Sequence, residues 1–428
     1  MSPPKRCWPR WTPVLADRRR RQEKACYRCP AFYCSCHDGG IRAKLAKLTT
    51  GEILEISRFK EQIMSLRLEG VSKSLDGETH IYPVDLELQK GSMNVLLGPT
   101  SAGKTSVMRL MAGLDKPDAG AVFWNNQDVT RRRVQDRDIA MVYQQFVNYP
   151  SMSVYDNIAS PLKLQKKPRA EIDDRVQEIA ELLQLAPILD RKPNEISGGQ
   201  QQRCAIARAL VKDVGLVLMD EPLANLDYKL REELRSEIPK LFAASGSIFV
   251  YATTEPEEAL LLGGNTATLW EGRVTQFGPS MDVYRRPVDE ITARVYSDPP
   301  MNFLPVRKAG NLVTFPNGQT AQAGDELALL PDREYRAGFR AHHIEVGGRP
   351  ADKLAFEAQL VITELTGSET YIHLEAAGER WIGLIPGTQT FEVGQQLHIG
   401  LDTANLFYFD HDGQRVGLPR AETGRVSA

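Results

Sequence analysis

Four short stretches of the chain are almost entirely apolar, and longer segments with mixed polarity separate them. The stretches are Met93–Leu97, Ile139–Gln144, Val214–Met219 and Ser247–Tyr251. A strand that is covered on both faces reads as a continuous hydrophobic run, whereas a strand with one solvated face alternates. From Met64 onward the pattern therefore predicts an α/β fold, a largely parallel sheet with helices on its faces.

Two further patterns divide the chain. The segment Glu171–Leu185 has apolar residues at helical spacing, and we expect a helical subdomain over about 146–210. These apolar positions are Ile172, Val176, Ile179, Leu182 and Leu183. Beyond about residue 300 the segments are short, alternating and rich in glycine, which predicts an all-β domain. Its expected strands are Asn311–Phe315, Glu326–Leu330, Phe356–Thr366, Thr370–Glu375, Trp381–Ile385 and Gln396–Leu401. We place the domain boundaries after residues 63 and 298, with the pair Pro299–Pro300 as the linker.

The composition is that of an ordinary globular protein, with 42% hydrophobic and 25% charged residues among 428. No apolar run approaches the roughly 18 residues that a membrane-spanning helix needs, so any membrane role is expected to be peripheral. The net charge of −2 is unevenly distributed, because residues 1–63 hold 14 Lys and Arg against 6 Asp and Glu. This basic head suits an anionic lipid, a nucleic acid, or simply a solvated, disordered tail.

Five of the six cysteines also lie in the head. They are Cys7, Cys26, Cys29, Cys34 and Cys36. Their spacing invites a zinc site, although it does not fit a regular finger with two ligand pairs. Two other interpretations remain open: a disordered tail, and a translation start placed too far upstream, with Met64 as the natural beginning. The head lacks the apolar core of a secretory signal.

A phosphate-binding loop follows the first apolar stretch directly. It reads Gly98, Pro99, Thr100, Ser101, Ala102, Gly103, Lys104 and Thr105, and Ser106 continues it into a helix. Glycines let the backbone curl so that successive N–H groups point at phosphate oxygens, and the helix presents its positive end to the same charge. Lys104 can reach the β- and γ-phosphates of ATP, and the Thr105 hydroxyl can hold Mg²⁺.

Two consecutive carboxylates, Asp220 and Glu221, end the third apolar stretch. This places them at the carboxyl edge of the predicted sheet, where such folds bind ligands. Asp220 is expected to organise the Mg²⁺ shell, and Glu221 to orient and polarise the attacking water. Paired acids are common on surfaces, and it is the preceding strand and the phosphate loop that make this pair informative.

The segment Ile196–Arg203, which reads ISGGQQQR, resembles the signature sequence of ABC ATPases. A Gly-containing turn that caps a helix is the alternative interpretation. The resemblance implies a P-loop NTPase of the ABC type. It further implies that the signature residues Ser197, Gly198, Gly199 and Gln200 contact ATP bound to a facing subunit. Gln144 would be the glutamine that senses Mg²⁺ and water. The segment Asn225–Asp227 would be the D-loop, in which Asp227 is the candidate nucleotide-contacting residue.

Within the family, the chain from about Leu66 onward resembles the ATPases of carbohydrate, polyol and glycerol-phosphate importers, which carry an OB-type C-terminal domain. Met301–Pro305, Gly338–Arg340 and Ile362–Gly383 carry this resemblance. The partners it implies are a second ATPase subunit, two transmembrane permease subunits and, indirectly, a solute-binding protein. It implies no nucleic-acid partner, and it places the chain at the cytoplasmic face of the membrane. Phe146–Ile158 would line a groove for a permease helix, although Tyr149-Pro150 also suits a plain turn.

Two positions depart from the family pattern. Thr254 stands where the family has a histidine that contacts the γ-phosphate, and a hydroxyl lacks the reach and charge of imidazole. Leu75 stands where an aromatic ring normally stacks on adenine. His80 or Tyr82 could replace that ring, or both could be ordinary strand residues.

The Thr254 substitution affects only one of the two half-sites, since the signature serves the facing subunit. It predicts a heterodimer in which the partner supplies most of the hydrolysis. A similar Thr-Thr-Glu-Pro variant in one of two paired ATPases of glycerol importers suggests glycerol as the solute. A homodimer, a catalytically weak regulatory subunit and a soluble ABC ATPase remain alternatives. His342 and His343 beside Arg340 fit either a regulatory contact or a solvated turn.

Overall fold

The structure of the chain is a computed structural model, and it describes residues 65–417 except 146, 225–227 and 348–352. The head with its cysteines lies outside the described residues, as do Phe146 and the Asn225–Asp227 segment. Within the described ranges, no helix is long and apolar enough to cross a membrane.

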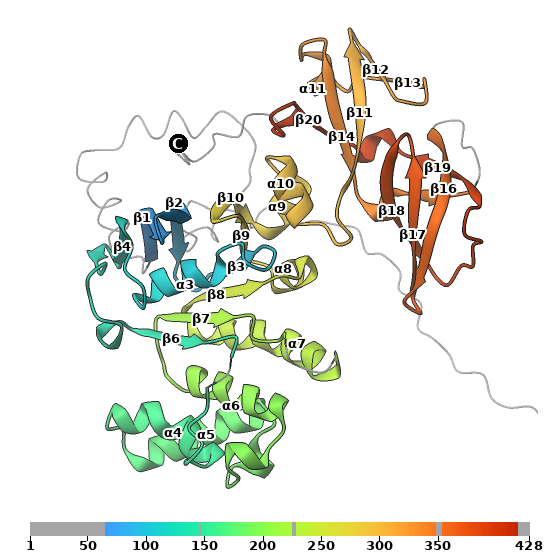
Figure 1. Cartoon of the computed structure of the whole chain (residues 1–428). Coiled ribbons are helices and arrows are strands. Elements are labelled where there is room, and N and C mark those ends of the chain that lie inside the picture. The colour runs from blue at the N-terminus through green and yellow to red at the C-terminus, as the bar shows by residue number, and fades with distance from the viewer. Residues whose placement is uncertain (1–64, 146, 225–227, 348–352, 418–428) are drawn as a thin grey trace, which may run out of the picture. The chain divides into compact units, whose positions relative to one another are not determined.

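Six strands form the central sheet, in the order β10-β9-β3-β8-β7-β6 (Figure 1). Their bounds are β3 (Met93–Leu97), β6 (Ile139–Val142), β7 (Leu216–Asp220), β8 (Ile248–Thr253), β9 (Asn265–Trp270) and β10 (Arg273–Pro279). Neighbouring strands are parallel except β10, which is antiparallel to β9. The four predicted apolar stretches correspond to β3, β6, β7 and β8. In β7, Leu216 and Leu218 pack in one hydrophobic core while Val217 and Met219 pack in another, so both faces are covered.

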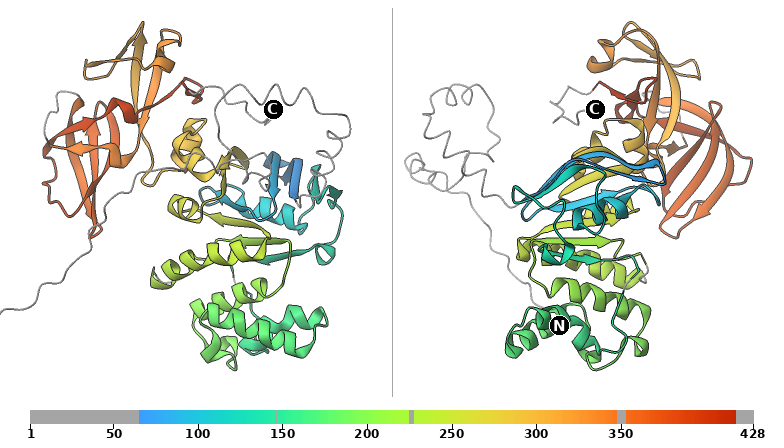
Figure 2. Two further views of the ribbon diagram at one scale, coloured as in Figure 1. Left: turned by 180° about the vertical axis from the view of Figure 1, so that it is seen from behind. Right: turned by 60° about the vertical axis from the view of Figure 1, so that its left-hand side comes forward.

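Helices lie on both faces of this sheet, with α3 and α7 packed in the cores on opposite faces. The helices before residue 300 are α3 (Lys104–Ala112), α4 (Val154–Leu164), α5 (Arg169–Leu182), α6 (Gly198–Leu210), α7 (Tyr228–Ser245), α8 (Pro256–Leu262), α9 (Ser280–Arg285) and α10 (Glu290–Val295). α4, α5 and α6 form a subdomain beyond the β6 edge, and the views in Figures 1 and 2 agree on this. The predicted helix Glu171–Leu185 is α5, which ends at Leu182 because Gln184 takes a left-handed conformation with φ of 55°.

A second, antiparallel sheet has the order β2-β1-β4-β5. Its strands are β1 (Ser65–Leu75), β2 (Glu78–Gln89), β4 (Ala119–Trp124) and β5 (Gln127–Asp128). Leu66, Leu68 and Val122 from this sheet pack in the same core as Val107 and Met108 of α3. The helix that follows the phosphate loop is thereby held between two sheets.

The C-terminal part is built from two antiparallel sheets, β13-β12-β11-β14-β20-β21 and β15-β19-β16-β17-β18. The strands are β11 (Asn302–Ala309), β12 (Leu312–Thr314), β13 (Thr320–Gln322), β14 (Glu334–Phe339), β15 (Glu345–Val346), β16 (Leu354–Leu365), β17 (Glu369–Ala376), β18 (Glu379–Pro386), β19 (Gln396–Leu401), β20 (Phe407–Phe409) and β21 (Arg415–Val416). The strand predicted at Glu326–Leu330 is wrong, because α11 (Asp325–Ala328) occupies that place. Leu327 and Leu330, three residues apart, pack in one core, as helical spacing allows.

Candidate functional site

The phosphate loop joins β3 to α3 and needs glycine at two positions. The N–H of Gly98 donates to the carbonyl of Thr253 at 3.3 Å, and a Cβ on Gly98 would collide with the carbonyl oxygen of Leu269. Gly103 has φ of +100°, and a Cβ there would lie 2.7 Å from Ile81 Cδ1. Pro99, Thr100, Ser101 and Ala102 form the turn between these glycines, and Ala102 N–H donates to Pro99 O at 3.1 Å. Glycine is required at both ends of the turn, because a side chain would collide with its neighbours there and because Gly103 adopts a positive φ.

Lys104 is buried at the centre of this loop, with a side chain only 4% exposed. Its ammonium donates to the carbonyl oxygens of Gly98 at 2.8 Å and Pro99 at 3.0 Å. It also forms an ion pair with Glu221 Oε1 at 3.2 Å. The fold therefore concentrates a positive charge inside the loop, beside the predicted catalytic carboxylate.

Side chains from three separate strands or their following loops meet beside Lys104. The Thr105 hydroxyl donates to Asp220 Oδ2 at 2.8 Å, which joins the start of α3 to the end of β7. Gln144, two residues after β6, donates from Nε2 to Glu221 Oε2 at 2.9 Å. Each oxygen of Glu221 thus has its own partner. Carboxyl ends of parallel strands share one edge of the sheet, which explains the convergence.

Asp220 has the environment of a cation ligand. Burial raises the pKa of its carboxyl, although the hydrogen bond from Thr105 works in the opposite direction. Its second oxygen, Oδ1, is buried and accepts no hydrogen bond from a described residue. Orphaned buried acceptors call for an unrecorded water or ion. The oxygen donors of Thr105, Asp220 and Gln144 are of the hard type that Mg²⁺ prefers, so these residues fit that ion.

The predicted signature residues lie elsewhere in the fold. Ser197 caps the start of α6. The backbone N–H of Gln200 donates to the Ser197 hydroxyl at 3.3 Å, and the backbone N–H of Ser197 donates to Gln200 Oε1 at 3.0 Å. Ser197 and Gly198 are exposed, and Gly199 and Gln200 are partly so. Since α6 packs against α4, α5 and β6 while α3 packs against β7 and β8, the structure does not bring this motif to the chain's own phosphate loop.

The residues at the two departures from the family pattern are both exposed. Thr254 follows β8 directly, and Leu75 ends β1 with 51% of its surface exposed. His80 hydrogen-bonds the Ser106 hydroxyl through Nε2 at 2.7 Å, beside the phosphate loop. One face of the Tyr82 ring is covered by the Arg273 guanidinium, 3.3 Å from the ring centroid. Of the two candidate substitutes for Leu75, His80 is therefore the one that touches the loop. The predicted Asp227 lies outside the described residues.

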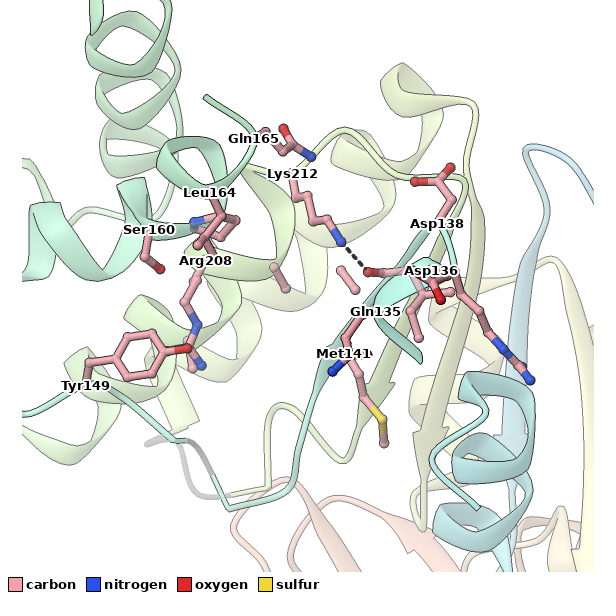
Figure 3. Close-up of a pocket in the computed structure, with 16 residues that line it drawn as sticks. Gln135, Asp136, Asp138, Met141, Tyr149, Ser160, Leu164, Gln165, Arg208 and Lys212 are labelled. Carbon is pink, nitrogen blue, oxygen red and sulfur yellow. Dashed lines mark hydrogen bonds between the residues drawn. The ribbon is translucent and has the colours of Figure 1, made fainter. Parts of the chain in front are cut away.

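A cavity of about 620 Å³ lies between the segment around β6 and the helices α4 and α6 (Figure 3). Tyr149 lines it, with the Arg208 guanidinium 4.8 Å from its ring centroid. Asp136, Met141 and Lys212 line it as well. The sequence indicated Tyr149 but not Arg208 or Lys212, because these come from α6 or the residues just after it and no local pattern marks them as groove residues.

The paired histidines do not form a fully solvated turn. They belong to a short 3-10 helix, Ala341–His343, and burial lowers the pKa of His343 to about 4. The neighbouring Arg340 is only 6% exposed and lies 3.7 Å from the ring centroid of Tyr284. Packing thus holds Arg340 and His343, whereas His342 is exposed, and a regulatory contact here stays a prediction.

Comparisons with known proteins identify the family. The family model described as ABC transporter matches residues 81–224. The trehalose/maltose import ATP-binding protein of Thermococcus litoralis is 36% identical over 367 residues, which cover 81% of this chain and 97% of that protein. The sn-glycerol-3-phosphate import ATP-binding protein of Pectobacterium atrosepticum is 35% identical over 354 residues, with coverage of 81% and 97%. The trehalose import ATP-binding protein of Mycobacterium tuberculosis is 34% identical over 385 residues, with coverage of 82% and 98%. The chain therefore belongs to the ATP-binding subunits of ABC importers, which hydrolyse ATP to drive transport.

Proposed function

We propose that this chain energises the import of a sugar, polyol or glycerol-type solute from the cytoplasmic face of the cell membrane. Its relatives are named for the import of trehalose, maltose and glycerol 3-phosphate. The observation that carries the proposal is the convergence of Lys104, Thr105, Gln144, Asp220 and Glu221 at one edge of the sheet. This set contains the groups that phosphoryl transfer from ATP to water requires.

Each member of the set has a distinct role in the proposed reaction. The loop N–H groups of 98–106 and the Lys104 ammonium bind the β- and γ-phosphates. Thr105, Asp220 and Gln144 would hold Mg²⁺, which neutralises charge on the phosphates when bound. Glu221 orients the attacking water and accepts its proton as the bond to phosphorus forms. Leu75 and His80 lie on the β1–β2 hairpin, which would contact the adenine base of ATP.

We further propose an asymmetric dimer. Thr254 follows β8 at the position of the family's histidine, and Ser197–Gln200, which are exposed or partly exposed, are available to a facing subunit. Such a chain would bind ATP in its own weak half-site and complete the stronger half-site of a partner that keeps the histidine. Glycerol as the solute, and an OB-type fold for the C-terminal domain from residue 299, belong to the same proposal. The cavity beside Tyr149 would receive a permease helix.

Two alternatives are supported by particular residues. Thr254 and Leu75 favour a catalytically weak regulatory subunit, because both remove a group that contacts ATP in relatives. The intact set around Lys104 and Glu221 favours a homodimer in which Thr254 suffices. The dimer arrangements differ in which chain's residues limit the rate.

ATP turnover by the full chain, alone and mixed with a histidine-containing ATPase subunit, separates these arrangements. We expect the chain alone to be about 10²–10³ slower than the mixture, the usual cost of losing one donor to a developing charge. In the mixture, Ser197→Arg should reduce turnover more than Lys104→Ala. Thermal melts of both variants check that they fold. Brisk turnover by the chain alone that Lys104→Ala abolishes would establish the homodimer instead.

A further inference from the structure

The turn that carries Thr254 is shaped by its neighbours. Thr253 is the last residue of β8, and its hydroxyl accepts from the N–H of Glu255 at 3.0 Å, which closes the turn over Thr254. The same hydroxyl donates to Glu258 Oε2 at 2.6 Å. Thr254 itself is exposed at the centre. Its position is therefore set by the groups that hold Thr253 and Glu255.

Two arginines of α7 hold Glu255 from the other side. Arg231 Nη1 donates to Glu255 Oε1 at 3.1 Å, and Arg235 Nη2 donates to Oε2 at 2.9 Å. The arginines are four residues apart and so project from the same face of the helix. We call Glu255, Arg231 and Arg235 the Glu255 clamp. Each carboxylate oxygen has its own guanidinium, which fixes both the distance and the rotation of the carboxylate.

The clamp rests on a buried layer. Arg235 is 10% exposed, and its Nη2 also lies 3.5 Å from Oε1 of Glu258, whose side chain is 5% exposed. Glu258 further accepts a hydrogen bond from Tyr251 at 3.1 Å. Burial raises the pKa of Glu258, while hydrogen bonds and the Arg235 charge oppose the shift. Rotation of Arg235 away from the turn would leave this carboxylate without its cation, so the arginine is confined.

α7 also connects the turn with the end of β7. Arg231 Nη2 lies 3.5 Å from the carbonyl oxygen of Ala224, three residues after Glu221. The Glu221 N–H, in turn, donates to the carbonyl of Ala252 in β8 at 3.0 Å. The segment leaving β7 and the turn after β8 are thus held by one helix. A shift of α7 would move both together.

We propose that the Glu255 clamp positions the Thr254 hydroxyl for ATP hydrolysis. The inference rests on the role of Thr254 proposed above. The threonine hydroxyl is bonded directly to Cβ, so rotation of the side chain cannot extend its reach from the backbone. The longer histidine side chain can place its imidazole nitrogens over a wider range of positions. The turn itself must therefore be placed accurately, since misplacement by about 1 Å costs about a hundredfold in rate. Arg231, Arg235 and Glu255 act as positioning residues and do not touch the substrate.

The test uses single-turnover hydrolysis of Mg-ATP with the full chain in excess. Glu255→Gln should lower the rate constant about ten- to a hundredfold. ATP affinity and Tm should change little, because Glu255 is 41% exposed and glutamine keeps one oxygen that accepts from a guanidinium. Glu232→Gln is the matched control: Glu232 also accepts from Arg235, at 2.7 Å, and is 43% exposed against 41% for Glu255, but it does not contact the turn. This control should leave the rate unchanged.

A double-mutant cycle distinguishes positioning from general damage. If the clamp acts through Thr254, Glu255→Gln adds nothing in a Thr254→Ala chain, whereas independent effects would multiply. Multiplying effects, or equal behaviour of Glu255→Gln and Glu232→Gln, would overturn the proposal while leaving the role of Thr254 intact. A Thr254→Ala chain that hydrolyses ATP normally would instead remove that role and the clamp's purpose together.

Amide hydrogen exchange supplies a readout that does not depend on turnover. The Glu255 N–H is bonded to the Thr253 hydroxyl, so Glu255→Gln should speed its exchange at least about tenfold if the clamp holds the turn. Glu232→Gln should leave it as in the parent chain. Unchanged exchange in Glu255→Gln would show that the turn is held without the clamp.

Discussion

Asp220 lies at the buried end of β7, where it accepts a hydrogen bond from Thr105 and keeps Oδ1 without a hydrogen bond from a described residue. Desolvation destabilises the ionised form of the Asp220 carboxyl, so its pKa is raised above the ordinary value. The folded chain therefore holds this proton more tightly than the unfolded chain. The associated stability is present in full below the unfolded pKa and is lost as pH rises through the folded one. At neutral pH the burial of this carboxyl therefore opposes folding.

Asp220→Asn removes this charge while keeping an oxygen that accepts from Thr105. We expect the Tm at neutral pH to rise by about 2 °C or more, while Mg²⁺-dependent ATP hydrolysis is lost, a trade-off common at active sites. Differential scanning calorimetry and an ATPase assay check the two effects. The rise in Tm should disappear as pH falls below about 4, where Asp220 is protonated in both folded and unfolded chains. A lower Tm at neutral pH would contradict this account.

The central strands could be predicted because each is almost entirely apolar, and α5 because its apolar residues repeat at helical spacing. The stretch Glu326–Leu330 is too short for its pattern to distinguish a strand from a helix, because five residues of mixed polarity fit either period until packing selects one. Within each motif of the site the residues are contiguous in sequence, so each motif could be predicted directly. The contact between Gln144 and Glu221 spans 77 residues. Parallel strand order, which no local pattern encodes, brings them together.

The Glu255 clamp shows what local patterns leave out. Charged residues four apart on α7 look like an ordinary solvated helix face, and their ion pairs reach residues beyond the helix. The available signal was the pair of acids flanking Pro256 just after the predicted fourth strand. The sequence alone does not show how α7 packs, so it cannot identify the arginines that pair with these acids.

The segment between β6 and α4 depends on one buried side chain. Asn157 of α4 is 0% exposed; its Oδ1 accepts from Tyr149 N–H at 2.7 Å and its Nδ2 donates to three carbonyl oxygens. We expect Asn157→Ala to lower the free energy of unfolding by about 1–3 kcal/mol, because these backbone groups lose their partner. Urea denaturation measures the loss. Gln165→Ala at the exposed end of the same helix is the control and should change little; equal losses would show that the anchoring is unimportant.

The chain as a whole contains separate hydrophobic cores. Two flank the central sheet and are composed of residues before 297, whereas a third, composed of residues from 304 onward, fills the C-terminal sheets. A small fourth cluster packs Ala293 of α10 with Met301, Phe303 and Phe409. Folding units with their own cores generally open with their own cooperativity. The ATP-binding machinery and the β domain thus have largely distinct sources of stability, joined by the small cluster around Ala293 and Phe409.

This organisation predicts two resolvable transitions in calorimetry of the full chain. Mg-ATP at about 100 times its dissociation constant should stabilise the unit that contains Lys104 by about 2.7 kcal/mol, and so raise one transition and not the other. In Lys104→Ala neither transition should move. Tyr251→Ala and Trp381→Ala, each in a different core, assign the transitions. A single transition that ATP shifts as a whole would show that the cores are coupled.

α3, which follows the phosphate loop, packs on β7 and β8, whereas α6, which opens at Ser197, packs with α4 and α5. In the proposed two-chain arrangement, a lesion at Lys104 and a lesion at Ser197 therefore fall on different composite sites. In a homodimer, two chains that each carry one lesion would jointly assemble one site with both parts whole, and defective alleles of this gene would complement each other in a cell. In the proposed heterodimer each assembly contains a single copy of this chain, so the same alleles would fail to complement.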